Sequence, residues 1–249
     1  MSNGYPTYPN TTITEAVCDI RFRLPKTQEW RPSLPGELFK YIQNEYPEME
    51  PVLEMGFQFE FGSSGTGTKL LPQPQKVRFK HKSRSLILQL AENSFSVNTL
   101  PPYQGWETMR NDVLSAWQQV EDVLKPEVIT RIGLRYINRF DKETDQDHLG
   151  DWLVANDYIP NGILSSEPGF LLRIQVHLNF ENVLIITLGD TKSEFGGQGA
   201  IIFDIDRIVE KEISLEQGAF KRQLDQLHTD VWNVFSSAKG EKLDNLLRR

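Results

Sequence analysis

The segment "VITRIGLRYINRF", residues 128–140, alternates between two kinds of side chain in a way that decides the fold. A period of two is typical of a strand that has one face on a core and the other toward solvent. The core face is predicted to hold Ile132, Leu134, Tyr136, Asn138 and Phe140, and the opposite face Arg131, Gly133, Arg135, Ile137 and Arg139. We therefore expect three arginines on a face without helices, where Gly133 leaves room for something to approach.

The same alternation recurs along the chain. In residues 13–24 the predicted core face is Ala16, Cys18, Ile20 and Phe22, and the predicted open face includes Asp19, Arg21 and Arg23. Residues 76–82, 84–90 and 93–100 are short alternating runs joined by polar turns, which predicts an antiparallel meander. Residues 169–180 and 182–190 predict a hairpin around Glu181-Asn182, and residues 200–208 predict a further strand. Residues 52–61 also alternate, whereas the Gly-, Ser- and Pro-rich residues 62–75 predict a flexible loop.

Two apolar stripes with helical spacing predict long amphipathic helices. The first follows Pro101-Pro102 and the second ends the chain. Their members are Trp106, Met109, Val113, Trp117, Val120 and Leu124 in the first, and Phe220, Leu224, Leu227, Val231, Val234 and Phe235 in the second. Shorter helices are predicted within residues 35–47 and 147–157. Stripes of this length must pack on something sizeable, and the sheet is the only candidate.

These elements predict an α+β fold, a curved and mainly antiparallel sheet with long helices packed on one face. Both halves read as a strand, a helix, three or four strands and a long helix. We expect one domain over residues 1–249, built from two similar halves, 11–125 and 126–249, as pseudo-duplicated β-α-β(3-4)-α units in a saddle-like arrangement. Lys125-Pro126 is the only plausible seam between them.

Composition and motifs exclude several classes of function. The net charge of −7 argues against a general polyanion binder, so nucleic acid is expected only through a local basic patch or through a partner. The single cysteine, Cys18, excludes an internal disulfide and is predicted to be a small buried residue. No signal-like segment or membrane span stands out, so a soluble cytoplasmic protein is expected. The glycine-rich runs at 62–67 and 195–199 do not lead into a helix, as a phosphate loop would require.

Asp204 and Asp206 form the most suggestive acidic feature, because alternate residues of a strand share one face. Such a pair could hold a divalent ion or divide acid and base roles, with His177 as a third member. The alternative is that the pair is solvated or neutralised by neighbouring arginines. The four histidines show no metal-binding spacing, and no nucleophile motif is present, so a non-enzymatic protein without a cofactor is favoured.

The predicted open face gathers polar side chains from every strand, including Gln58, Glu60, Arg78 and Lys80. We single out its arginine-rich part as the candidate binding site: Arg21, Arg23, Arg131, Arg135, Arg139, Arg173, Gln175 and His177. Arginine suits bidentate recognition of carboxylates and phosphates. Two interpretations stay open, a solvated face with incidental salt bridges or a surface that binds a partner. In the second, replacing Arg135 and Arg173 by alanine should abolish partner capture without changing thermal stability.

Several blocks resemble a family of bacterial proteins with sporadic distribution and no settled function. They are PGELFKYIQNEYPEME, FQFEF, VRFKHKSRSLILQLAENSFSVNTLPPYQGWETM, RIGLRYINRF, GFLLRIQV, LIITLGD and FDIDRI, in order over nearly the whole chain. The resemblance implies an accessory role, as in phage-defence or toxin-related systems, and transfers no catalytic residues. By element order the fold is also similar to the duplicated saddle of TATA-binding-type proteins, which carries no function with it.

The function expected from the sequence is therefore a binding protein that holds a protein partner or an anionic ligand on the open face. Two alternatives remain, a metal-assisted hydrolase acting on nucleic acid or nucleotide, and binding of structured nucleic acid by the saddle. A homodimer through an exposed sheet edge or through the terminal helix is a further expectation.

Overall fold

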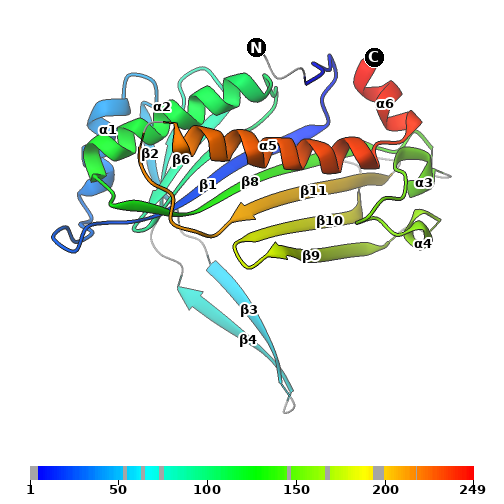
Figure 1. Cartoon of the computed structure of the whole chain (residues 1–249), viewed down its shortest axis with the longest axis horizontal. Helices are drawn as coiled ribbons and strands as arrows, with labels where there is room; N and C mark the ends of the chain where they lie inside the picture. Colours follow the sequence, from blue (N-terminus) through cyan, green and yellow to red (C-terminus); the bar gives the residue numbers. More distant parts are fainter. Residues whose placement is uncertain are drawn as a thin grey trace.

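The computed structural model describes residues 5–52, 55–62, 65–72, 76–144, 147–165, 169–192, 199–216 and 218–249, and only the backbone of 55–62, 65–72 and 191–192. Figure 1 shows its main sheet with the helices gathered on one face. In chain order the elements are β1 (Ile13–Arg23), α1 (Leu34–Ile42), β2 (Glu48–Val52), β3 (Met55–Gly62), β4 (Gly65–Pro72), β5 (Lys76–Lys80), β6 (Leu86–Ala91), β7 (Ser94–Thr99), α2 (Trp106–Leu124), β8 (Val128–Asp141), α3 (Leu149–Trp152), α4 (Asn161–Leu164), β9 (Leu171–Asn179), β10 (Asn182–Lys192), β11 (Gly199–Val209), α5 (Ala219–Ala238) and α6 (Glu241–Arg248).

Nine of the strands form one antiparallel sheet, in the order β2-β5-β6-β7-β1-β8-β11-β10-β9. The expected α+β class is confirmed. β1 and β8 lie side by side at the centre, with Cys18 opposite Leu134 and Asp19 opposite Gly133. From this pair the order runs outward through β7, β6 and β5 on one side and through β11, β10 and β9 on the other. The sheet is open, and β2 and β9 are its edges.

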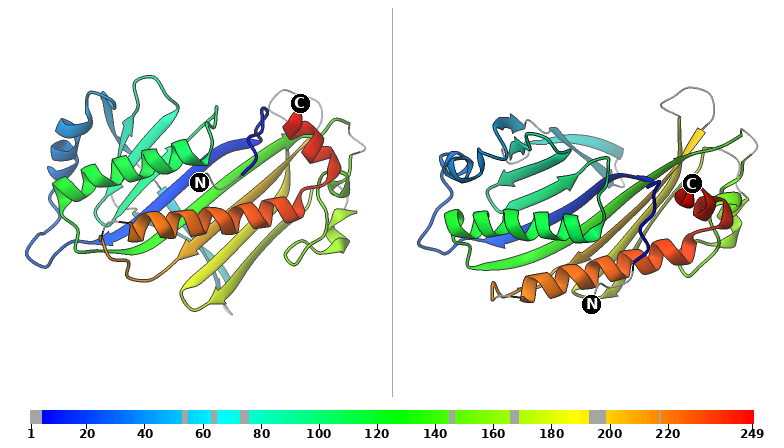
Figure 2. Two further views of the ribbon diagram at one scale, coloured as in Figure 1. Left: turned by 45° about the horizontal axis from the view of Figure 1, so that its top comes forward. Right: turned by 90° about the horizontal axis from the view of Figure 1, so that it is seen from above.

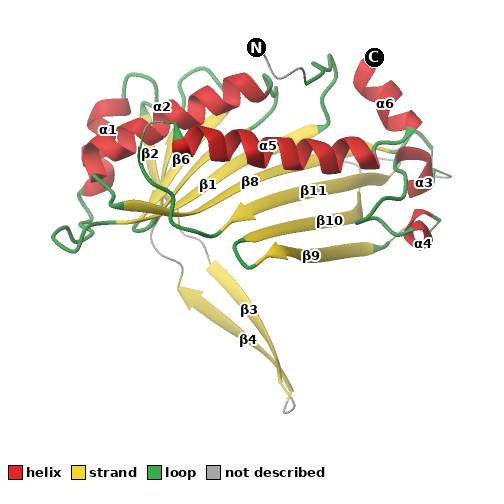
Figure 3. Ribbon diagram, viewed as in Figure 1, coloured by secondary structure: helices red, strands yellow, loops and turns green. Residues whose placement is uncertain are grey.

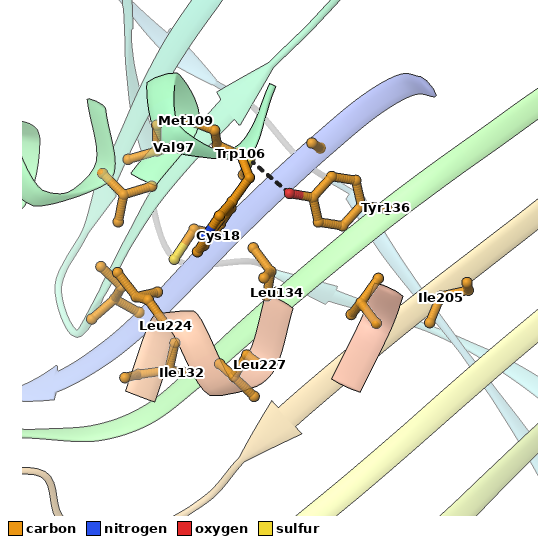
Figure 4. Close-up of a cluster of buried hydrophobic side chains, with 14 of the residues drawn as sticks. Cys18, Val97, Trp106, Met109, Ile132, Leu134, Tyr136, Ile205, Leu224 and Leu227 are labelled. Atoms are coloured by element: carbon orange, nitrogen blue, oxygen red, sulfur yellow. Dashed lines mark hydrogen bonds between the residues drawn. The ribbon is translucent and has the colours of Figure 1, made fainter. Parts of the chain in front are cut away.

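One face of the sheet carries the helices, as Figures 2 and 3 show from different sides. α5 packs over β8 and β11, α2 packs over β7, and the two helices touch each other. All members of the two predicted stripes are buried, and so are the predicted core residues of β1 and β8. In Figure 4, Cys18 and Leu134 lie in one cluster with Trp106 of α2 and Leu224 of α5. The assignment of core and open faces from the period of two is thus confirmed for these strands.

The predicted loop at residues 62–75 is wrong in part, because residues 65–72 form β4. The strand β4 pairs with β3 alone, so this hairpin is a second, two-stranded sheet, which projects away from the main one in Figure 1. Glycine, serine and threonine suppressed the strand signal there. Gln58 and Glu60 therefore do not belong to the nine-stranded sheet, and their side chains lie outside the described residues. Residues 195–198 of the second glycine-rich run also lie outside them.

The terminal helix is two helices, which corrects the prediction of a single one. α5 ends at Ala238, and α6 begins after Gly240. A Cβ atom at Gly240 would lie 2.7 Å from the carbonyl oxygen of Trp152, to which the Gly240 N–H donates a hydrogen bond. Only glycine permits this approach. The predicted helix within 147–157 is likewise reduced to the four residues of α3.

We expect Leu224→Ala, in the middle of the α5 stripe, to lower the free energy of unfolding by about 2–5 kcal/mol, because it removes a fully buried side chain. Urea unfolding followed by circular dichroism measures this change. Lys221→Ala, at an exposed position of the same helix, is the control and should change it by less than about 0.5 kcal/mol. Equal effects of the two changes would contradict the packing of α5 on the sheet.

Candidate functional site

The predicted arginines lie on the face of the main sheet opposite to α2 and α5. Register places Arg135 in a row with Asp206 of β11, Ile185 of β10 and Gln175 of β9. A neighbouring row contains Arg173, Thr187, Asp204 and Ile137. We call this helix-free surface of β1, β8, β11, β10 and β9 the open face. The strand order therefore brings together residues as distant in the sequence as Asp19 of β1 and Asp206 of β11, which both flank β8.

Arg135 is held by Asp204 at the middle of the open face. Its Nε and Nη2 atoms donate hydrogen bonds to Asp204 Oδ1 and Oδ2, at 2.8 and 2.7 Å. The Asp204 side chain is only 8% exposed, whereas that of Arg135 is 44% exposed. This bidentate geometry fixes the guanidinium plane and satisfies both carboxylate oxygens. Arg135 is therefore both a surface residue and the partner of a buried charge.

Arg131 folds back over Gly133 to reach Asp19. The Arg131 Nη1 atom donates a hydrogen bond to Asp19 Oδ2, and the Arg131 Nε atom lies 3.6 Å from Glu210 Oε1. A Cβ atom at Gly133 would meet the Arg131 guanidinium at 3.5 Å. The expectation that Gly133 leaves room for something to approach is wrong, because the arginine of the same strand occupies that room.

Two further arginines on this side of the sheet also meet opposite charges. Arg139 Nη2 lies 3.4 Å from Asp141, and Arg23 bonds Glu212 at 2.8 Å and Glu127 at 3.4 Å. On the far half of the sheet, Glu50 of β2 accepts hydrogen bonds from Arg78 and Lys80. The open face is thus a network of paired charges and carries no cationic patch made of the four arginines at 23, 131, 135 and 139.

Two arginines, Arg173 and Arg21, lie on either side of this network. No carboxylate of the described residues pairs with them. Arg173, exposed on the edge strand β9, donates to the Thr187 hydroxyl at 3.0 Å. The neighbouring Gln175 and His177 form a hydrogen bond of 3.1 Å with each other. Arg21 is exposed on β1, directly opposite Arg131. Of the predicted site residues, these are the ones most available to a partner.

Asp206 differs from the other acids of the open face. Among the described residues no hydrogen bond or ion pair engages its carboxylate. Burial raises the pKa of Asp206 to about 6, and the nearby carboxylates of Asp204 and Asp19 add to this, against the opposing effect of Arg131 and Arg135. Asp206 is therefore a carboxyl group that changes charge near neutral pH.

The geometry does not assemble the metal site that the sequence suggested. Both carboxylate oxygens of Asp204 are engaged by Arg135, and His177 lies on β9, two strands away from β11. In the part of the chain that the structure describes, no group of three His, Cys, Asp or Glu residues is close enough to hold a metal ion. Cys18 is fully buried, which raises the pKa of its thiol, so it is not placed to react.

Sequence reasoning missed that aliphatic side chains lie between the charges of the open face. Val17, Ile137, Ile185 and Ile202 are half-buried there, in the same rows as the paired charges. The alternation already placed Ile137 with the arginines, so a signal was present. The open face is therefore a mixed surface of paired charges and aliphatic groups and not a polar one.

Comparison with known proteins yields no relative from which a function follows. No protein-family model matches the chain, and no curated protein matches it. Among solved structures, the chain is similar to one described as "Crystal structure of the di-domain ARO/CYC StfQ from the steffimycin biosynthetic pathway", with 9% sequence identity, covering 88% of this chain and 94% of that chain. The TM-score is 0.19, so this likeness supports no statement about fold or function.

The Arg135–Asp204 pair changes the stability expected of the Arg135 variant. Arg135→Ala leaves a nearly buried carboxylate without its partner and should lower the free energy of unfolding by about 1–3 kcal/mol. Arg173→Ala, at the exposed edge, should change it by less than about 0.5 kcal/mol. In an Arg135→Ala background, Asp204→Asn should restore part of the loss. Urea unfolding of the three variants measures this, and a neutral Arg135→Ala would contradict the pairing.

Asp206 predicts a pH dependence of stability. Because its pKa in the folded chain, about 6, exceeds the ordinary value of 3.8, folding favours the protonated form. Its contribution is fully present below about pH 4 and is lost as the pH rises to about 6. We therefore expect Asp206→Asn to raise the free energy of unfolding at pH 7.5 by about 1–2 kcal/mol, and to leave it nearly unchanged at pH 4. Chemical unfolding at the two pH values measures this, and an equal effect at both would contradict it.

Proposed function

We propose that this chain is a non-enzymatic binding protein that holds a protein partner on its open face. The observation that carries this proposal is the mixture on that face of half-buried aliphatic side chains and arginines fixed by carboxylates of neighbouring strands. Protein interfaces combine an apolar centre with arginine and a polar rim. Val17, Ile137, Ile185 and Ile202 would supply the centre.

The fixed arginines favour binding because little side-chain freedom is lost when a partner arrives. Arg135 already has its guanidinium plane held by Asp204 and still has 44% of its side chain exposed. A group ordered before binding costs less conformational entropy in the complex. Arg21 and Arg173, which no described carboxylate engages, would pair with acidic groups of the partner. Such rim charges act mainly on specificity and on the association rate.

A protein partner fits this face better than a polyanion or a small anionic ligand. Nucleic-acid affinity depends on the number of phosphates neutralised, but the arginines at 23, 131, 135 and 139 already neutralise acids of this chain. The net charge of −7 opposes polyanion binding further. The metal-assisted hydrolase and the nucleic-acid saddle are for these reasons weaker alternatives. An accessory setting of the phage-defence or toxin-related kind rests on the sequence resemblance alone.

We also infer that residues 11–125 and 126–249 are copies of one β-α-β(3-4)-α unit and form a single, saddle-like domain. In support, the strands run outward from the β1–β8 pair in the same order on both sides, and a long helix closes each half. In the described part of the chain, no helix is both long enough and apolar enough to cross a membrane.

Site-specific photo-crosslinking in the native host tests the proposed interface. A photoreactive residue at position 21 or 173 should crosslink one and the same protein, because both positions border the open face. The same residue at the exposed position 221 of α5, or 40 of α1, should not. Crosslinks from the helix positions alone, or nucleic acid in place of protein at positions 21 and 173, would contradict the proposal.

The captured protein then allows a quantitative test with matched variants. Arg21→Ala combined with Arg173→Ala should weaken its binding by about tenfold or more, since two interfacial charge pairs are lost. Lys40→Ala combined with Lys221→Ala removes the same charge from the helix-bearing side and should leave the dissociation constant within about twofold. Equal weakening by both pairs would indicate a general charge effect and would refute a specific role for the open face.

A further inference from the structure

A cavity of about 550 Å³ lies on the other side of the sheet, between the helices and the strands. Its walls come from residues 5–8 and 11–13, the turn before α2 with the first turn of α2, β8, β11, the middle of α5, and α6. Figure 2 shows the N-terminal segment running from β1 past the beginning of α2 to α5. Cavities that hold small organic molecules have volumes of roughly 300–1,000 Å³. This cavity has the size of a small-molecule site.

Several aromatic rings line the cavity. The Trp106 and His228 rings are stacked, with centroids 4.2 Å apart and an angle of 9° between the planes. Tyr5 meets His228 edge to face at 4.5 Å and Trp232 at 5.8 Å. Tyr136 approaches His228 at 6.0 Å from the floor of the cavity, and Figure 4 shows its position beside Trp106. The edges and faces of such rings favour a flat aromatic guest.

The charged side chains of the wall are Arg110 and the exposed Glu107. The Arg110 guanidinium pairs with Asp225 at 3.0 Å, and the Trp106 indole N–H donates to the same carboxylate oxygen, which ties α2 to α5 beside the cavity. Burial lowers the pKa of His228 to about 4, so its imidazole is neutral at pH 7. Burial also raises the pKa of the Tyr103 and Tyr136 phenols. An anionic guest would lose its hydration here and meet no unpaired cation of this wall, and the exposed Glu107 carboxylate would pair only weakly with a cationic guest.

Tyr103 and His228 are among the hydrogen-bond acceptors of the wall. The Tyr103 and Tyr136 hydroxyls lie 2.9 Å apart and either can donate to the other, while the Tyr136 hydroxyl also lies 3.5 Å from the Met109 sulfur, which can only accept. The Tyr103 oxygen keeps lone pairs as acceptors. His228, 7% exposed, has a buried Nδ1 atom without a hydrogen-bond partner among the described residues. A neutral imidazole has one acceptor nitrogen.

We propose that this cavity binds an uncharged, planar aromatic molecule that carries at least one hydrogen-bond donor. The site is separate from the open face, and its occupancy does not depend on the protein partner proposed above. Residues 5–8 and α5 would enclose the rings, and Tyr103 would accept the donor's hydrogen bond.

Three probes test the chemistry of the guest. N-phenyl-1-naphthylamine is uncharged, has flat rings and carries one N–H donor, and its fluorescence should rise on saturable 1:1 binding to the full chain. 8-Anilino-1-naphthalenesulfonate has the same rings and an added sulfonate, and should bind at least about tenfold more weakly. Dodecanol is an uncharged aliphatic alcohol. It should displace the first probe only at a concentration at least about tenfold higher than that of a non-fluorescent aromatic amine. Equal affinity of the sulfonate or of dodecanol, or no binding of the amine, would overturn the proposal.

Variants locate the binding in the cavity. Val231→Trp places a large ring where a buried α5 side chain lines the cavity and should abolish binding of the amine. Tyr5→Ala removes one partly buried aromatic wall, which packs against the core without belonging to its buried set, and should weaken binding by about tenfold. Tyr41→Ala changes a tyrosine of α1 that is 67% exposed and outside the cavity, and should leave binding within about twofold. If Val231→Trp does not fold, Tyr5→Ala decides: binding unchanged from that of Tyr41→Ala refutes the cavity as the site.

Discussion

The antiparallel pairing of β1 with β8 is the constraint on which the rest of the structure depends. It joins the two halves of the sheet, and its register decides which side chains meet the helices. Cys18 opposite Leu134 faces the core, while Asp19 opposite Gly133 faces away from it. A shift of one residue would bring Arg131 and Arg135 under the helices and move Leu134 into solvent. The burial of apolar side chains under α2 and α5 therefore also fixes the composition of the open face.

Pairing of charges across strands gives the open face its character. An exposed ion pair contributes little to stability, but Asp204 is nearly buried and has both oxygens engaged by Arg135. The main effect is on geometry, because the guanidinium is held in one plane on a rigid sheet. As a binding surface of the kind we propose, it would distinguish partners by shape and charge pattern, whereas a patch of free arginines would attract any polyanion.

The sequence predicted the individual strands and helices better than the contacts between them. A period of two and a period of three to four are local, so the faces of β8 and the stripes of α2 and α5 followed directly from residue spacing. The pairing of Arg135 with Asp204 depends on β11 lying beside β8, and strand order is not encoded in either segment alone. The β3–β4 hairpin was missed because glycine and serine weaken the strand pattern.

The cavity could not have been predicted either, because its wall also depends on contacts between elements that are distant in the sequence. Its wall needs Tyr5, Tyr103, Tyr136 and His228, which come from four separate parts of the chain. In the sequence, Trp106 and Val231 are ordinary members of apolar stripes. Only the spacing between α2, α5 and the sheet distinguishes a filled core from a chamber lined by rings.

The two proposed sites, the open face and the cavity, lie on opposite sides of β8, so binding at one of them could affect binding at the other. Arg135 and Tyr136 are neighbours on β8, one on the open face and the other in the cavity wall. Communication would need an element with two arrangements that both sites favour differently. β8 is hydrogen-bonded to strands on both sides along its length and lies under α5, and these contacts oppose a second arrangement of the strand. On the opposite wall of the cavity, Tyr5 contacts Thr229, His228 and Trp232 of α5 and reaches neither Arg135 nor Asp204. We therefore expect that binding at one of the two proposed sites does not change the affinity of the other, although both sites share strand β8.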